Sequence, residues 1–270
     1  MTWLEELCGV KKPIIAMCHL QPLPGDPEYD KNGGMDKVLD YARKDLHALQ
    51  EGKVDTIMFS NEFSFPYQTK VDTITVVAMA EIIGELKKEI KIPFGVDCQY
   101  DANASIDLAL ATGASYMREI ITGTYASDFG LWNTDPSTTL RYRNRIGADH
   151  VKILFSINPS SAAKYMADRD LVSIAKSVEF NFHPDTLCVA GLPGDESDEA
   201  MLKEIKASLK RTPIVCDAGC NAENIVRRLR GSDGAVVATS FKKDGIFENL
   251  VDVKRVQDFI DVVNDYRKSL

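Results

Sequence analysis

The chain has 270 residues, of which 44% are hydrophobic, and its formal net charge is −8. This size and composition allow one large hydrophobic core, and single-domain barrels reach this length. The acidic excess argues against a nucleic-acid ligand, because a polyanion would be repelled. We see no run of about 18 apolar residues and no signal peptide, so we expect a cytoplasmic protein without a membrane span.

Short apolar runs alternate with longer amphipathic stretches along the whole chain. Near-continuous apolar runs are typical of strands in a parallel sheet that is covered on both faces. The expected strands are 13–18, 54–59, 93–98, 115–118, 151–155, 186–190, 213–217 and 234–238. The expected helices are 35–52, 75–90, 104–114, 136–147, 168–180, 198–211, 222–231 and 253–270.

These repeats predict an α/β protein, a single-domain (β/α)8 TIM barrel over residues 1–270. The main alternative is an open doubly wound sheet. Its dinucleotide-binding form is disfavoured, since no Gly-x-Gly-x-x-Gly follows the first strand. The six cysteines form no Cys-x-x-Cys pair and are expected as small core residues. Cys220 differs because it falls in an expected loop, where a reactive thiol is the alternative.

Polar residues follow several expected strands, where the carboxyl ends of barrel strands carry the chemistry. The first strand ends at His19, and three prolines stiffen the loop 21–27 behind it, so we expect that loop to form a wall of the pocket. Arg118 lies in an apolar run, where an unpaired guanidinium is costly, so it needs a carboxylate partner or an anionic ligand. A structural salt bridge is the alternative for Arg118.

The candidate catalytic residues are His19, Glu62, Asp97 and Arg118. We expect His19 and one of the two carboxylates to move protons, while Arg118 holds an anionic group. A purely structural histidine remains an alternative. The ligand types of His19, Glu62 and Asp97 also suit a divalent metal ion, so a metal stays open although no cofactor is expected.

A phosphate site is expected between the last two strand–helix turns, as in many barrels. Its candidate residues are Asp217, Gly219, Asn221, Thr239, Ser240 and Lys242. Unpaired N–H groups at a helix start attract anions, and Gly219 lets the backbone approach closely. Asn221 is the expected N-cap, and Lys242 would add positive charge. Ordinary turn and cap chemistry is the alternative.

The segment 124–136 is expected as a long loop over the mouth of the barrel. Trp132 would stack on a substrate ring or pack on the rim, and Asp128 and Asn61 would line the pocket.

Several long motifs of the chain are similar to those of a known family. They include "PIIAMCHLQPLPGDP" (13–27), "CDAGCNAENI" (216–225) and "DGAVVATSFKKDGIFENLVDVKRVQDF" (233–259). Over nearly its whole length the chain resembles the BtpA/SgcQ family of TIM-barrel proteins. The resemblance implies a link to photosystem I accumulation for some members, sugar-operon enzymes for others, and a barrel like those that bind ribulose phosphates. It matches recurrent positions at His19, Asn61, Arg118, Asp128, Gly219, Asn224 and Lys242.

The chain departs from the family pattern at three strand ends. Many members carry Glu-Asn, Lys-His and Thr-Gly where this chain has Ser60-Asn61, Ile157-Asn158 and Pro193-Gly194. The extra carboxylate, lysine and histidine are therefore missing here.

Together these features predict an isomerase or lyase that uses acid/base catalysis on a small phosphorylated, sugar-like metabolite. A non-catalytic assembly factor and a nucleosidase-type hydrolase are the alternatives. The expected partner is a small anionic substrate, and a homo-oligomer remains open.

Overall fold

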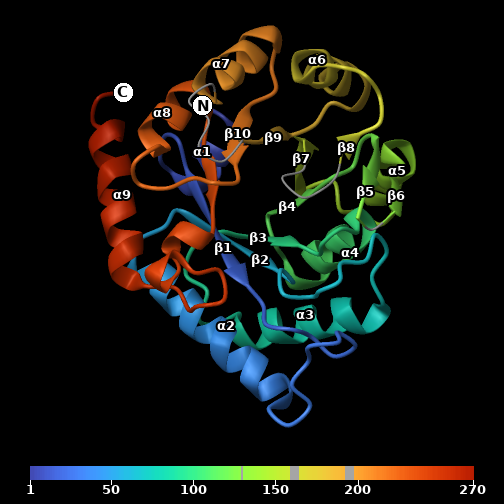
Figure 1. Cartoon of the computed structure of the whole chain (residues 1–270), viewed down its shortest axis with the longest axis vertical. Helices are drawn as coiled ribbons and strands as arrows, with labels where there is room; N and C mark the ends of the chain where they lie inside the picture. The colour runs from blue at the N-terminus through green and yellow to red at the C-terminus, as the bar shows by residue number, and fades with distance from the viewer. Residues whose placement is uncertain (129, 159–163, 192–197) are drawn as a thin grey trace.

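A computed structural model describes residues 1–128, 130–158, 164–191 and 198–270 (Figure 1). The strands of its main sheet are β1 (Ile14–His19), β2 (Thr56–Ser60), β3 (Phe94–Asp97), β4 (Tyr116–Glu119), β7 (Lys152–Asn158), β9 (Thr186–Ala190), β10 (Ile214–Asp217) and β11 (Ala235–Val237). All pair in parallel and close into a barrel in the order β1-β11-β10-β9-β7-β4-β3-β2. The closed ring confirms the TIM barrel and rules out the open sheet.

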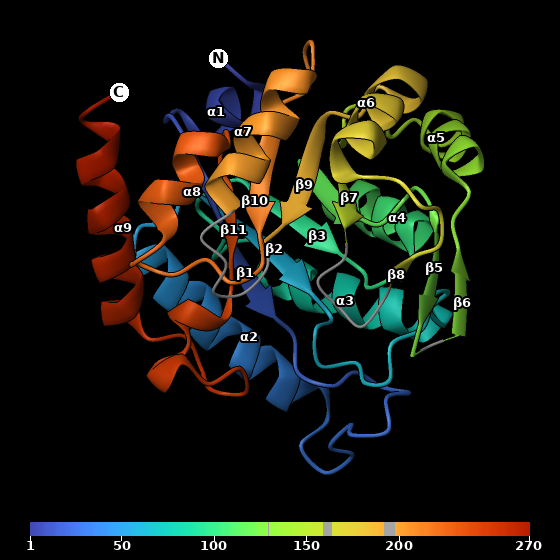
Figure 2. The same ribbon diagram turned by 45° about the horizontal axis from the view of Figure 1, so that its top comes forward.

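Helices cover the outside of the barrel, as both views show (Figures 1 and 2). They are α2 (Gly34–Glu51), α3 (Thr73–Leu86), α4 (Ala102–Thr112), α5 (Pro136–Arg145), α6 (Leu171–Phe182), α7 (Asp198–Ser208), α8 (Ile225–Gly231) and α9 (Val253–Arg267). Their apolar faces and the outward side chains of the strands form the main core. None of the helices within the described residues is long and apolar enough to cross a membrane.

A short helix that the sequence pattern did not predict closes the amino-terminal end of the barrel. Helix α1 (Trp3–Cys8) has a capping box between Thr2 and Glu5. Its Leu4 packs into the lower barrel interior. The Trp3 indole N–H donates to the backbone oxygen of Asp185 at 3.0 Å, which fixes the helix to the start of β9.

Alternation along the strands sends every second side chain into the barrel. In β1, Ile15 and Met17 belong to the interior cluster, while the residues between them face the helices. Tyr116 fills the centre, and its ring leaves no room for a side chain at position 95: a Cβ there would lie 2.2 Å from a ring carbon. Gly95 is therefore required by the close approach of Tyr116.

The same alternation brings polar side chains to the carboxyl ends of the strands. The next inward positions after this apolar layer include His19, Ser60, Asp97, Arg118 and Asp217. A polar layer therefore lies on an apolar one, and the site is built at this end of the barrel.

The segment expected as a long loop forms regular structure instead. Strands β5 (Thr124–Ser127) and β6 (Gly130–Asn133) pair as an antiparallel hairpin, and β8 (Lys164–Tyr165) pairs with β5. The prediction of a loop over 124–136 is thus wrong. Tyr125 on β5 and Trp132 on β6 are cross-strand neighbours, and both are buried. With Ile120 they form a small apolar cluster that stabilises the hairpin beside the mouth.

Candidate active site

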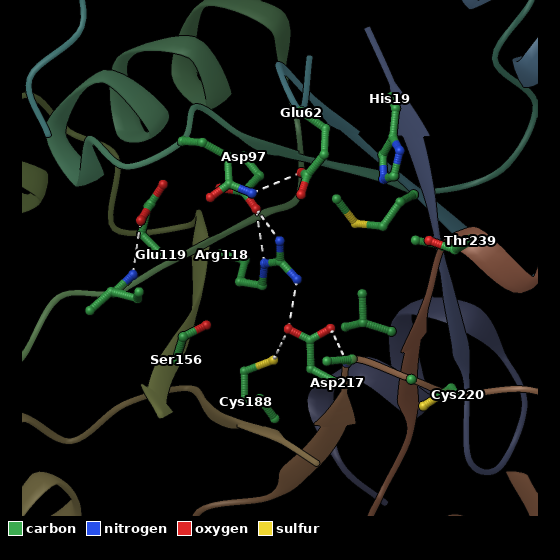
Figure 3. Close-up of a pocket in the computed structure, with 18 of the residues that line it drawn as sticks. His19, Glu62, Asp97, Arg118, Glu119, Ser156, Cys188, Asp217, Cys220 and Thr239 are labelled. Atoms are coloured by element: carbon green, nitrogen blue, oxygen red, sulfur yellow. Dashed lines mark hydrogen bonds and ion pairs between the residues drawn. The ribbon is translucent and has the colours of Figure 1, made fainter. Parts of the chain in front are cut away.

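A cavity of about 230 Å³ opens among the carboxyl ends of the barrel strands (Figure 3). Its described polar and charged lining side chains are His19, Glu62, Asp97, Gln99, Tyr100, Arg118, Glu119, Ser156, Asn158, Cys188, Asp217, Cys220, Thr239 and Ser240. Four of them are carboxylates, whereas Arg118 is the one lysine or arginine among these described lining residues. Proton transfer and hydroxyl recognition suit such a lining, because carboxylates accept hydrogen bonds from hydroxyl groups.

Arg118 joins two carboxylates across the cavity. Its Nε and Nη2 donate to Asp97 Oδ2 at 2.9 and 2.6 Å, and its Nη1 donates to Asp217 Oδ2 at 2.8 Å. These bonds supply the carboxylate partner that its apolar surroundings require. Asp217, expected as a phosphate ligand, instead positions Arg118 at the floor of the site.

Asp97 and Glu119 form a buried carboxyl pair beside Arg118. Both side chains are at most 2% exposed. Asp97 Oδ1 and Glu119 Oε1 are buried without a hydrogen-bond partner among the described residues, and each carboxyl group shifts the pKa of the other. Burial, and next the Asp97 charge, raise the pKa of Glu119 well above its usual range. Burial also raises the pKa of Asp97 despite Arg118. Both shifts favour a protonated carboxyl group in the pair.

His19 supplies a neutral imidazole on the opposite side of the cavity. The ring is 3% exposed and lies against Phe63 and Phe247, with centroid distances of 6.1 and 5.2 Å. Burial lowers the pKa of His19 to about 4, although the Glu62 charge opposes this shift. Its Nδ1 is buried without a hydrogen-bond partner among the described residues. The imidazole is therefore available as a proton acceptor.

Glu62 is held as a carboxylate between His19 and the carboxyl pair. Its Oε2 accepts from Ser60 Oγ at 2.9 Å and from Gln99 Nε2 at 2.8 Å. Burial would raise its pKa, but His19, Arg118 and these two hydrogen bonds outweigh burial and lower the pKa of Glu62. The cavity therefore presents a proton donor and proton acceptors with oppositely shifted pKa values.

The rim between β10 and β11 offers backbone donors. Ala218, Gly219, Cys220, Thr239 and Ser240 line the cavity there. The backbone N–H groups of Gly219, Cys220 and Thr239 donate to no residue in the described parts of the chain. Ser240 Oγ is buried and also lacks a partner there. Gly219 has φ +69°, where a side chain is strained. This rim can accept an anion.

Lys242 does not belong to that rim. The segment after β11 forms two 3-10 turns, η1 (Thr239–Phe241) and η2 (Lys243–Gly245). Lys242 lies between them, is 2% exposed, and its Nζ lies 2.5 Å from Asp45 Oδ2 on α2. Its charge is neutralised within the helical layer, so the expected positive charge at the phosphate site is absent from this position.

The two candidates from the segment 124–136, Asp128 and Trp132, also lie outside the described cavity lining. Asp128 is exposed at the tip of the β5–β6 hairpin. Trp132 is buried, with its ring centroid 4.4 Å from that of Tyr100 and 5.5 Å from that of Tyr125. Trp132 borders a second groove beside α3 and α4 rather than the mouth cavity. Of the two alternatives for Trp132, stacking on a substrate ring or packing on the rim, this position favours packing.

The two asparagine candidates have structural contacts. Asn61 is buried, and its Oδ1 accepts the Gln99 N–H at 2.8 Å, which orients the side chain that holds Glu62. Asn221 is exposed, and its Oδ1 accepts the N–H groups of Glu223 and Asn224 in a turn. Helix α8 starts at Ile225, so Asn221 is not its N-cap. Neither asparagine lines the described cavity.

The proline-rich loop is fixed but does not form the cavity wall. Asp26 Oδ2 accepts the Leu23 N–H at 2.6 Å and the Ser64 hydroxyl at 2.6 Å. Residues 21–27 do not contribute to the described lining. Pro193 and Gly194 lie outside the described residues.

No group of three His, Cys, Asp or Glu side chains within the described ranges has a metal-binding arrangement. His19, Glu62 and Asp97 all line the cavity, yet Asp97 is engaged by Arg118 and Glu119.

Several lining residues received no role from the sequence. Glu119 is the last residue of β4, and the alternation of side chains along a strand predicts that it points away from the barrel axis. Phe247 follows two 3-10 turns, which leave no periodic pattern in the sequence. Gln99 lies just beyond its strand, where a position could have been proposed but not a partner.

The fold and the site together define a (β/α)8-barrel protein with a cavity of titratable side chains at the carboxyl ends of its strands. The BtpA family model matches residues 10–265, and the chain belongs to the BtpA family. It is 53% identical to the sgc region protein SgcQ of Escherichia coli, over 99% of this chain and 100% of that one. It is 27% identical to the photosystem I biogenesis protein BtpA of Synechocystis, over 95% and 90% of the two chains.

A solved structure supports the fold independently. The thiamine phosphate pyrophosphorylase of Pyrococcus furiosus matches with a TM-score of 0.57 at 17% identity, over 97% of this chain and 98% of that one. At this identity the likeness establishes the barrel architecture.

Proposed function

We propose that this protein is an enzyme that moves protons on a small phosphorylated, sugar-like metabolite, as an isomerase or a lyase. The observation that carries the proposal is the cavity itself: Asp97, Glu119, His19 and Glu62 line it together, and burial raises the pKa of the first two while the pKa values of His19 and Glu62 are lowered. Isomerisation and carbon–carbon or carbon–nitrogen cleavage both need a donor and an acceptor on one substrate.

In this mechanism Glu119 donates a proton to a carbonyl or leaving oxygen, which leaves both carboxyl groups of the pair ionised until the proton is returned. Arg118 stabilises that charge, because it already binds Asp97 through two nitrogens. His19 or Glu62 removes a proton from carbon or from a hydroxyl group. The acid and the base lie on different strands around one cavity, so a single bound molecule reaches both.

A phosphate group would rest on the rim of Gly219, Cys220, Thr239 and Ser240. Backbone N–H groups and a buried hydroxyl are suitable donors to phosphate oxygens. The carboxylates of Glu62 and Asp217 would meanwhile accept hydrogen bonds from substrate hydroxyls. Separation of a donor-rich rim from a carboxylate-rich floor supports a substrate with a phosphate at one end and hydroxyls at the other.

The names of one relative and of one structural neighbour bear on this proposal in different ways. A thiamine phosphate pyrophosphorylase handles a phosphate compound, which agrees with a phosphate rim. A photosystem I biogenesis protein suggests the alternative of a non-catalytic assembly factor. The nucleosidase alternative loses its main support, since Trp132 packs outside the mouth.

The test is isothermal titration of the full chain with pentose and hexose phosphates and with the same sugars lacking phosphate. We expect a phosphorylated sugar to bind about tenfold or more tighter than its unphosphorylated partner. Ser240→Asp should abolish this preference by placing a negative charge on the rim. Ser240→Asn, of similar size and neutral, should keep most of it.

Proton transfer is then measured on the sugar phosphate that binds, by exchange of its carbon-bound hydrogens with deuterium from the solvent. Glu119→Gln keeps a neutral side chain of the same shape, so it should leave binding nearly unchanged and slow exchange by about 100-fold or more. Absence of binding by every compound would contradict the proposal and favour the assembly factor. Equal exchange in the variant would remove Glu119 as the acid.

A further inference from the structure

Two cysteines meet behind the turn that follows β10. Cys216 Sγ and Cys220 Sγ lie 3.8 Å apart, and both residues are at most 5% exposed. In the parts of the chain that the structure describes, no other two thiols lie within hydrogen-bond distance. The spacing of this pair, Cys-x-x-x-Cys, matches no common redox motif, so the two cysteines were not predicted to meet.

A buried guanidinium lies against one of the two sulfurs. Arg228 is 1% exposed, and its Nη1 donates to Cys220 Sγ at 3.1 Å and to the backbone oxygen of Asp217 at 3.3 Å. A positive charge in contact with sulfur favours the thiolate, which is the reactive form. The hydrogen bond with Cys216 and then the Arg228 charge lower the pKa of Cys220 against burial.

The second sulfur remains a thiol. The hydrogen bond with Cys220, and next burial, raise the pKa of Cys216 well above its usual range. The Cys216 thiol also lies 3.5 Å from the Gly234 oxygen and 3.6 Å from the Ser232 hydroxyl. The two cysteines therefore differ: one is activated, and the other carries the proton.

The cavity borders one of the two cysteines. Cys220 is among the residues that line the mouth and Cys216 is not, although both belong to the main core cluster. Figure 3 shows Cys220 at the edge of the cavity. A small oxidant in the cavity therefore meets Cys220 first.

We propose that Cys220 is a peroxide-reactive thiol and that Cys216 is its resolving partner. The Cys220 thiolate attacks one oxygen of a hydroperoxide, and the O–O bond breaks. The attacked oxygen stays on sulfur as a sulfenic acid, while the other oxygen takes up a proton and leaves as water or an alcohol. The Cys216 sulfur then attacks Cys220, a disulfide forms, and the sulfenic oxygen departs as water. Two thiols are oxidised, and one peroxide is reduced.

The geometry requires little movement for this second step. A disulfide holds its sulfurs about 2 Å apart, so the present contact must shorten by roughly 1.8 Å. Residues 217–219 lie between the two cysteines, which makes the product a small loop at the cavity rim. The chemistry needs no sugar phosphate, so it stands or falls separately from the function proposed above.

The test treats the full chain with hydrogen peroxide and follows peptide masses over time. We expect the peptides of Cys216 and Cys220 to lose two hydrogen atoms together and to regain them with a reductant. Cys8 is the internal control. It is more exposed, but burial raises its pKa to about 12. Cys220 should react about tenfold or more faster than Cys8.

Single variants separate the two roles. Cys216→Ser should stop the oxidation of Cys220 at a gain of one oxygen atom, while Cys220→Ser should leave Cys216 unmodified. Cys18→Ala, a change at a buried cysteine elsewhere in the core, should react like the wild type. Oxidation of Cys8 before Cys220, or a wild-type protein in which the pair never forms a disulfide, would overturn the proposal. The wild-type masses decide it even where a variant fails to fold.

Discussion

Single residues at the mouth of the barrel are controlled by their surroundings more than by their type. His19 and Glu119 both lose most of their contact with water, and burial disfavours the charged form of each. The result is a neutral imidazole and a neutral carboxylic acid in one cavity. Both states depend on neighbours from other strands, among them Glu62 and Asp97.

The His19 imidazole makes stability depend on pH. Its pKa is about 4 in the folded chain and about 6.5 when unfolded, so the unfolded state takes up the proton first as pH falls. The free energy of unfolding should therefore decrease between pH 6.5 and pH 4, by up to about 3 kcal/mol from this group.

Chemical denaturation across this pH range checks the prediction. His19→Gln should show a shallower decrease than the wild type. His150→Gln, a change at an exposed histidine, should follow the wild-type curve. A His19→Gln curve as steep as that of the wild type would mean that this imidazole does not titrate in the window.

Helices and turns that are distant in the sequence are joined by a buried ion pair that the local sequence does not predict. Lys242, between η1 and η2, binds Asp45 in the middle of α2, and the other oxygen of Asp45 accepts the Val251 N–H at 2.7 Å. One carboxylate thus fixes both ends of the segment that leads into α9. The 3-10 turns beside the phosphate rim depend on this contact for their position.

Removing the lysine should destabilise the fold without touching the rim. Lys242→Met leaves Asp45 buried and unpaired, and we expect a loss of about 3 to 5 kcal/mol in the free energy of unfolding. Lys243→Met, at the exposed neighbour, should change it by less than about 0.5 kcal/mol. Unchanged stability in Lys242→Met, together with lost affinity for a sugar phosphate, would instead restore Lys242 as a phosphate ligand.

The whole molecule separates stability from chemistry at the two ends of its barrel. At the amino-terminal end, Arg267 of α9 donates to the backbone oxygens of Lys11 and Lys12 at 2.8 and 3.0 Å, and to Asp55. Asp55 Oδ2 accepts the Ile14 N–H at 2.7 Å. The last helix is thereby tied to the first two strands, far from the cavity.

A change at this end should alter stability alone. Arg267→Met leaves Asp55 without its cation, and we expect the free energy of unfolding to fall by about 3 kcal/mol while ligand affinity stays within about twofold of the wild type. Lys268→Met is the exposed neighbouring control. A large loss of affinity in folded Arg267→Met would show that the two ends of the barrel are coupled.

The sequence by itself determined the barrel and the positions of most of its strands and helices. It also placed His19, Glu62, Asp97 and Arg118 at strand ends that meet around one cavity. These features follow from periodicity, because burial on both faces of a parallel sheet demands continuous apolar strands. The hairpin at 124–133 was missed, since short alternation beside glycines resembles a loop.

Only the tertiary structure decided which charges are free. Arg118 is shared by Asp97 and Asp217, Lys242 is neutralised by Asp45, and Glu119 keeps a proton beside Asp97. Asp45 and Lys242 are 197 positions apart in the chain. Charge pairing and proton affinity depend on distances of a few ångströms and on exclusion of water, and a linear pattern of residue types contains neither.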